Sequence, residues 1–160
     1  MRYIISFIVI AFLSLSGVKA QEVYKLVLAN ATRIVNSPVS SYTQTQIAQF
    51  KRTALTYMKT KAFEETDTIP SNFLDTQAYY LSEYVTLFFD QIVKTKKLNQ
   101  AERKERIMLF MDASISNPMF DDNDEETTMS YVKDGNELTP FSLNTDWQKA
   151  YAAVKSQLKK

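Results

Sequence analysis

Apolar residues recur three and four positions apart along most of the chain, which is the spacing of one face of a helix. The first such stripe covers residues 23–34 and ends before Pro38, because the residue preceding a proline is pushed out of the α region. A second helix is predicted to begin near Ser41 or Thr43, each followed three residues later by a glutamine that could complete a capping box. Its apolar stripe consists of Ile47, Phe50, Ala54, Leu55, Met58 and Ala62.

A third apolar stripe is the longest and the widest. We expect this helix to begin at Ser71 or Asp75, after a polar linker that Pro70 closes. Because its apolar residues cover so wide an arc, the helix must be covered from two sides, which predicts a place at the centre of a bundle. One row consists of Leu74, Ala78, Leu81, Val85, Phe88 and Ile92, and the row beside it of Phe73, Tyr80, Tyr84 and Leu87.

Two further helices are predicted in the second half of the chain. Asn99 and Glu102 match a capping box, and Glu102 precedes Arg106 by four positions, which favours an ion pair. The last helix is expected to begin at Thr145, with Gln148 three residues later. The inner faces consist of Ile107, Phe110, Met111 and Ser114 in the first of these helices, and of Trp147, Ala150, Tyr151, Val154 and Leu158 in the second.

Residues 119–144 leave two interpretations open. One is a short helix over about 124–133, with acidic residues in its first turn, a lysine in its last turn and Gly135 as the left-handed residue after its end. The other is a β-hairpin that turns at Gly135. We favour the helix because both ends carry the expected chemistry, and we expect an extended segment after it, with Phe141 and Leu143 packing across the bundle.

The fold class follows from these patterns and from the scarcity of glycine. The chain has two glycines, too few for the many turns of a sandwich or barrel. We therefore predict an all-α fold: a single helical bundle over residues 21–160, with about five longer helices plus one short helix or hairpin.

The N-terminus has the features of a secretory signal peptide over residues 1–20. Arg2 supplies a basic start, Tyr3–Leu15 is almost wholly apolar, and Val18-Lys19-Ala20 matches a cleavage site before Gln21. The apolar run is shorter than the about 20 residues that span a bilayer as a helix. The sequence therefore predicts export to the periplasm or the exterior of the cell.

Composition excludes several kinds of chemistry. The chain has no histidine and no cysteine, which rules out imidazole catalysis, thiol nucleophiles and disulfides. Removal of Arg2 and Lys19 leaves 17 basic and 18 acidic residues, a formal charge of −1. Nucleic-acid binding needs a basic excess, so we expect no nucleic-acid partner. We also expect no membrane association after cleavage and no cofactor.

An acidic run offers one candidate metal site. Calcium takes six to eight oxygen ligands, which alternating carboxylates in a loop can supply. An EF-hand loop needs Gly at its sixth position and Glu at its twelfth, where this chain has Glu126 and Val132. We therefore favour a charged first turn of a helix over a calcium site. The candidate ligands are Asp121, Asp122, Asp124 and Glu125.

Three other groups of residues could act on a ligand or substrate. Tyr79, Tyr80 and Tyr84 could stack on sugars or peptides, although at helical spacing we favour core packing. A basic group beside the turn between the third and fourth helices is more typical of a solvated face. Carboxylates next to helix ends could support glycoside hydrolysis, but their spacing does not indicate a raised pKa. The basic group is Lys94, Lys96, Lys97, Arg103, Lys104 and Arg106, and the carboxylates are Glu64, Glu65, Asp67 and Asp121.

Thr68 is a candidate modification site. Asp67-Thr68-Ile69 resembles the three-residue motif on which Bacteroidetes O-glycosylate exported proteins, and it lies in a predicted loop. Pro70 biases the residue before it toward the extended backbone that a transferase needs.

The stretch from Pro140 to Trp147, with Ala150 after it, resembles a group of small secreted α-helical proteins of gut Bacteroidetes that has no agreed activity. The resemblance implies a compartment and no chemistry. We expect a non-enzymatic, soluble module that binds a protein or a glycan. The alternatives are a small carboxylate-dependent hydrolase of envelope polymers and a periplasmic immunity or inhibitor protein.

Overall fold

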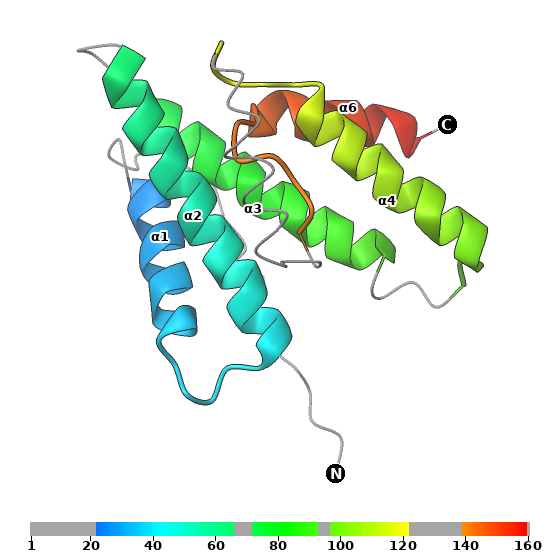
Figure 1. Ribbon diagram of the computed structural model, residues 1–160, viewed down its shortest axis with the longest axis horizontal. Coiled ribbons are helices and arrows are strands. Elements are labelled where there is room, and N and C mark those ends of the chain that lie inside the picture. Colours follow the sequence, from blue (N-terminus) through cyan, green and yellow to red (C-terminus); the bar gives the residue numbers. More distant parts are fainter. Residues whose placement is uncertain (1–21, 66–71, 93–96, 122–138, 160) are drawn as a thin grey trace.

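The computed structural model describes residues 22–65, 72–92, 97–121 and 139–159. Within these ranges all regular secondary structure is α-helical, which confirms the predicted all-α fold. None of the helices in this part of the chain is both long enough and apolar enough to cross a membrane. The helices are α1 (Glu22–Val35), α2 (Tyr42–Glu65), α3 (Phe73–Ile92), α4 (Gln100–Ile115) and α6 (Trp147–Gln157) (Figure 1).

Helix α3 lies at the centre of the bundle, as its wide apolar arc predicts. It packs against α1, α2, α4 and α6, while α1 pairs with α2 on one side of it and α4 pairs with α6 on the other (Figure 1). Both of its predicted rows face other helices, because the first is fully buried and the second is buried or half-buried. The buried residues of α3 are Leu74, Gln77, Ala78, Leu81, Tyr84, Val85, Phe88 and Ile92.

The segment before α6 carries two side chains into the core without forming a helix or strand. Phe141 is 1% exposed and Leu143 is 4% exposed, which confirms that they pack across the bundle. The Phe141 ring lies 5.7 Å from Phe50 of α2, 5.2 Å from Tyr84 and 5.0 Å from Phe88 of α3, measured between ring centroids. These contacts are edge-to-face, each worth about 0.5–1.5 kcal/mol beyond the buried area. Through Phe141, this segment, which is orange in Figure 1, therefore contacts both α2 and α3.

Two helices begin with the capping boxes that the sequence predicts. At α2 the Ser41 backbone N–H donates to Gln44 Oε1 (2.9 Å), and the Gln44 N–H donates to Ser41 Oγ (3.3 Å). At α4 the Asn99 N–H donates to Glu102 Oε2 (2.8 Å), and the Glu102 N–H donates to Asn99 Oδ1 (3.0 Å). Ser41, and not Thr43, is therefore the cap of α2.

The start of α3 differs from the prediction. The helix begins at Phe73, and the Asn72 carbonyl accepts the first backbone bond, from Thr76 N–H (2.9 Å). Asp75 lies inside the first turn and does not start the helix. Its carboxylate Oδ1 accepts a bond from the Tyr24 N–H of α1 (2.8 Å), so Asp75 satisfies a free donor at the start of a different helix.

The start of α6 also differs, by one residue. Asp146 is the N-cap, because its carboxylate accepts a bond from the Lys149 N–H (3.2 Å). Thr145, the predicted cap, is buried, and its hydroxyl bonds to the Ser142 carbonyl (2.7 Å) and lies 2.7 Å from Ser114 Oγ. The Thr145 hydroxyl therefore forms its bonds between α4 and the segment before α6, and it does not cap α6.

Three predictions fall outside the described residues. These are the signal peptide over 1–20, the choice between a short helix and a hairpin over 124–138, and the exposure of Thr68.

Candidate binding surface

A groove with a volume of about 710 Å³ lies between α4 and α6, which pack side by side (Figure 1). One face of α4 lines it from Glu102 to Ala113, the turn after α4 adds Ser116 and Asn117, and the C-terminal half of α6 forms the opposite wall. The residues that line it on α4 recur three and four positions apart, so they share a single helical face.

Five of the less exposed residues that line the groove are apolar, and they form its floor. Leu109 of α4 and Leu158 of α6 are half-buried, and Leu98 lies at the end where α4 begins. Ala113 and Ala153 also line it, and their short side chains leave space between the two helices. An apolar floor of this kind can bury the apolar side of a ligand.

The rim of the groove is acidic. Glu102, Glu105 and Asp112 line it with exposed side chains. Arg106 also lines it, but its guanidinium donates to Gln91 Oε1 on α3 (3.3 Å) instead of pairing with Glu102 as predicted. Among the described lining residues, three carboxylates therefore face one guanidinium that already has a partner within the protein.

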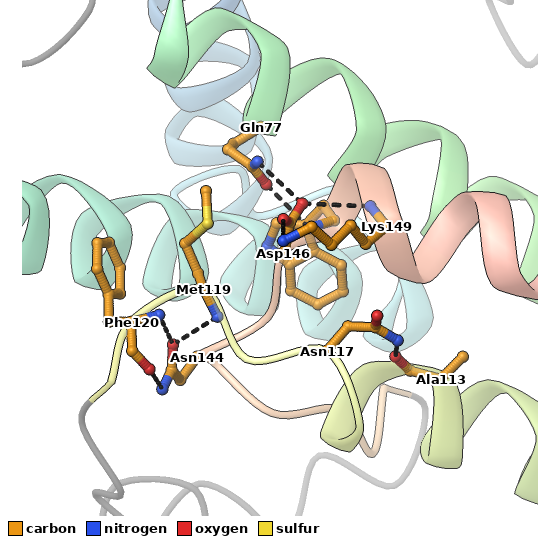
Figure 2. Close-up of polar contacts among 9 residues, drawn as sticks. Gln77, Ala113, Asn117, Met119, Phe120, Asn144, Asp146 and Lys149 are labelled. Atoms are coloured by element: carbon orange, nitrogen blue, oxygen red, sulfur yellow. Dashed lines mark hydrogen bonds and ion pairs between the residues drawn. The ribbon is translucent and has the colours of Figure 1, made fainter.

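A buried amide holds the turn after α4 against the segment before α6. The Asn144 Oδ1 accepts bonds from the Met119 N–H (3.1 Å) and the Phe120 N–H (2.9 Å), and the Asn144 Nδ2 donates to the Phe120 carbonyl (3.0 Å) (Figure 2). The Asn144 side chain thus links these two segments through three hydrogen bonds.

The first turn of α6 is fixed to α3 and to the end of α4. Gln77 Oε1 accepts from the Trp147 N–H (2.9 Å), and Gln77 Nε2 donates to Asp146 Oδ1 (3.3 Å) (Figure 2). The Asp146 N–H donates to the Asn117 carbonyl (2.8 Å). Asn117 itself lines the groove. Bonds that hold α4 and α6 without a ligand preorganise the groove between them.

A tyrosine cluster lies on a second surface, formed by α3 and α6. It consists of Tyr79 and Tyr80 of α3 and Tyr151 of α6, all half-buried. The Tyr80 ring centroid lies 5.1 Å from that of Tyr79 and 5.7 Å from that of Tyr151, and the Lys155 Nζ lies 5.6 Å from the Tyr151 ring centroid. The cluster therefore combines two helices that are distant in the sequence.

Tyr84, which the sequence groups with Tyr79 and Tyr80, belongs to the core. Its ring is fully buried and its hydroxyl donates to the Phe110 carbonyl of α4. Burial raises the pKa of this phenol strongly. The predicted core packing is confirmed for Tyr84, and Tyr79 and Tyr80 also pack against the core while they keep part of their surface in solvent.

Charged groups of both signs border the tyrosine cluster. The Glu83 carboxylate of α3 interacts electrostatically with Tyr151. Burial, and then the Glu83 charge, raise the pKa values of Tyr79 and Tyr151. Burial lowers the pKa of the Lys51 ammonium of α2 to about 8, although the Glu83 charge acts in the opposite direction. Lys51, Glu83 and the cluster therefore interact electrostatically.

The other predicted site residues are not brought together by the described structure. Asp121 is exposed directly after Phe120, and among the described residues no group of three or more acidic side chains could hold a metal ion. Lys97, Arg103 and Lys104 are exposed, as a solvated face would be. Asp122, Asp124, Glu125, Thr68, Asp67, Lys94 and Lys96 lie outside the described residues, as do the side chains of Glu64 and Glu65 at the end of α2.

Sequence reasoning missed the groove, although a signal for it exists. Glu102, Glu105, Leu109 and Asp112 follow the spacing of one helix face and lie beside the core face that begins at Ile107. A second stripe of mixed acidic and apolar character on a helix indicates a surface that can bind a partner.

No protein-family model, curated protein or solved structure matches this chain. The resemblance to small secreted helical proteins of Bacteroidetes stays an expectation.

Proposed function

We propose that this protein is an exported, non-enzymatic binding module whose α4–α6 groove holds a basic amphipathic helix of a partner protein. The observation that carries the proposal is the combination of an apolar floor with a rim of three exposed carboxylates. A groove of this kind is one of the recurring ways in which proteins bind a helical segment of another protein.

The length of the groove suits such a segment. Its wall on α4 extends from Glu102 to Ala113, and at a rise of 1.5 Å per residue this corresponds to about 17 Å. A bound helix of about three turns would span the same distance and place apolar residues on the floor every three or four positions.

The charge of the rim favours a partner rich in lysine or arginine. Glu102, Glu105 and Asp112 carry three negative charges and Arg106 one positive charge, so the charged residues that line the groove have a net charge of −2. The Arg106 guanidinium bonds to Gln91 of α3. Complementary charges of this kind raise the association rate and fix the orientation of the bound segment, whereas an acidic segment would be repelled. The exposed basic residues of α4, Arg103 and Lys104, are not among the described residues that line the groove.

Two synthetic amphipathic peptides of about 18 residues test the proposal, since that length forms about five helical turns. One carries leucine and lysine and the other leucine and glutamate, and fluorescence anisotropy measures binding of each. We expect the lysine peptide to bind and the glutamate peptide not to bind. Equal affinity for both would overturn the proposal.

Reversing the charge of two carboxylates that line the groove tests whether the peptide binds there. The double substitution Glu105→Lys with Asp112→Lys should weaken the lysine peptide by about tenfold or more, which corresponds to about 1.4 kcal/mol. Glu22→Lys, a reversal at an exposed site of α1, is the matched control and should leave the affinity unchanged. A double variant that binds as well as the original protein would show that the peptide does not use the groove.

A further inference from the structure

We infer that the tyrosine cluster is a second binding site, separate from the groove, and that it takes a neutral carbohydrate. The inference stands on the geometry of Tyr79, Tyr80 and Tyr151 and on the charged groups that border them.

The three rings are splayed, with Tyr80 between the other two. The planes of Tyr79 and Tyr80 meet at 81°, and those of Tyr80 and Tyr151 meet at 48°. The three rings pack against the core and keep part of their surface in solvent. A sugar ring has apolar C–H faces that can pack against the exposed part of an aromatic ring. Tyr80 contacts both of the other rings, so its removal should disturb the whole cluster.

The polar groups of the cluster match the hydroxyls of a sugar. Each tyrosine hydroxyl can donate and accept a hydrogen bond, the Glu83 carboxylate accepts, and the Lys155 ammonium donates. The Glu83 charge acts on both Tyr79 and Tyr151, and the Lys155 Nζ lies 5.6 Å from the Tyr151 ring centroid, so both charged groups lie near the cluster. A sugar hydroxyl, which also donates and accepts, can bond to any of them.

The mixture of charge and aromatic surface favours a carbohydrate over a protein partner at this site. The centre of a protein–protein interface is depleted of charged residues, because charges that lose water without gaining a partner are costly. Here the Lys155 ammonium lies over the Tyr151 ring, and the Glu83 charge acts on Tyr79 and Tyr151. A ligand rich in hydroxyls keeps these charges hydrogen-bonded, and charges of both signs favour a neutral ligand over an anionic one.

Affinity electrophoresis of the protein tests this inference. Native gels contain one of three soluble neutral polysaccharides: an α-glucan, a β-glucan or a mannan. We expect at least one to slow migration, and we expect Tyr80→Ala to abolish the effect. Tyr42→Ala is the matched control, because Tyr42 is 71% exposed on α2 and lies outside the cluster.

Each outcome decides the question. Migration unchanged in all three gels would overturn the inference, and so would retardation that persists in Tyr80→Ala. If Tyr80→Ala loses its helical circular dichroism, Glu83→Gln replaces it, since it keeps the size and removes the charge; retardation should then weaken, and unchanged retardation overturns the inference. Binding of the lysine peptide should persist in Tyr80→Ala, so failure of this site is distinguishable from failure of the groove.

Discussion

Buried amide side chains bind together parts of the chain that are far apart in the sequence. Gln77 is 3% exposed within the apolar face of α3, and its two ends bond to the Trp147 N–H and to Asp146. A buried amide is costly unless it is hydrogen-bonded, so the bonds to these two partners offset the free-energy cost of burying Gln77. The sequence does not reveal this, because a glutamine beside an apolar stripe is usually solvated and its partners come about 70 residues later.

Replacing Gln77 tests the importance of these bonds. Gln77→Ala leaves the buried Asp146 carboxylate and the Trp147 N–H with fewer partners, and we expect the free energy of unfolding to fall by about 1–3 kcal/mol. Urea denaturation followed by circular dichroism measures it. Gln148→Ala, at an exposed position of α6, is the control and should change stability by less than about 0.5 kcal/mol. Equal losses in the two variants would contradict the assigned role.

The pH dependence of stability should show a maximum in mildly alkaline solution. Burial lowers the pKa of Lys51 to about 8 from its usual 10.5. Between these values the unfolded chain binds more protons than the folded one, so stability rises with pH. Burial raises the pKa of the Tyr84 phenol, so above about pH 10 the unfolded chain releases a proton that the folded chain keeps, and stability falls.

The urea concentration at the midpoint of unfolding, measured from pH 7 to pH 11, should follow this profile. Lys51→Met should remove the rise above pH 8, whereas Lys59→Met, at an exposed site of the same helix, should retain it. A wild-type profile without the rise would show that Lys51 does not titrate as the structure indicates.

The helices themselves were largely predictable, because their determinants are local. The capping boxes at Ser41 and Asn99, and the apolar row that includes Leu81, depend only on residues three or four positions apart. The predicted helix starts that were wrong are residues whose side chains bond to parts of the chain that are distant in the sequence. Asp75 bonds to α1, and Thr145 bonds to Ser114, so neither is free to cap its own helix.

Leu81 tests the central position of α3. It is fully buried, and Leu81→Ala should reduce the free energy of unfolding by about 2–5 kcal/mol, because the substitution removes apolar contacts and leaves a cavity. Leu26→Ala on α1 is the matched control, since Leu26 is 60% exposed, and it should change stability by less than about 0.5 kcal/mol. A small loss for Leu81→Ala in urea denaturation would place this face of α3 at the surface.

The molecule as a whole carries little net charge, so its binding properties depend on how charges are distributed. The acidic rim of the groove and the exposed Arg103 and Lys104 lie on the same helix. Total charge cannot reveal such a separation, whereas the spacing of Glu102, Glu105 and Asp112 could have indicated the rim. The opposite wall could not be predicted, because it requires knowledge that α6 packs beside α4.

Export is a prediction about the whole chain. The basic start, the apolar run and Val18-Lys19-Ala20 predict removal of residues 1–20. N-terminal sequencing of the protein recovered from outside the cytoplasm should therefore begin at Gln21. Recovery of a chain that still begins at Met1 would contradict it.

The position of Phe141 and Trp147 in the chain has a consequence for the order in which the protein acquires its structure. Both rings contact Phe50 of α2 and Tyr84 of α3, so the first three helices lack part of their centre until these much later residues arrive. Contacts between such distant residues form slowly, because a long loop must close before they are made. A chain synthesised from its N-terminus therefore cannot complete this aromatic core until residues 141–147 have been made, when most of the protein has already been synthesised.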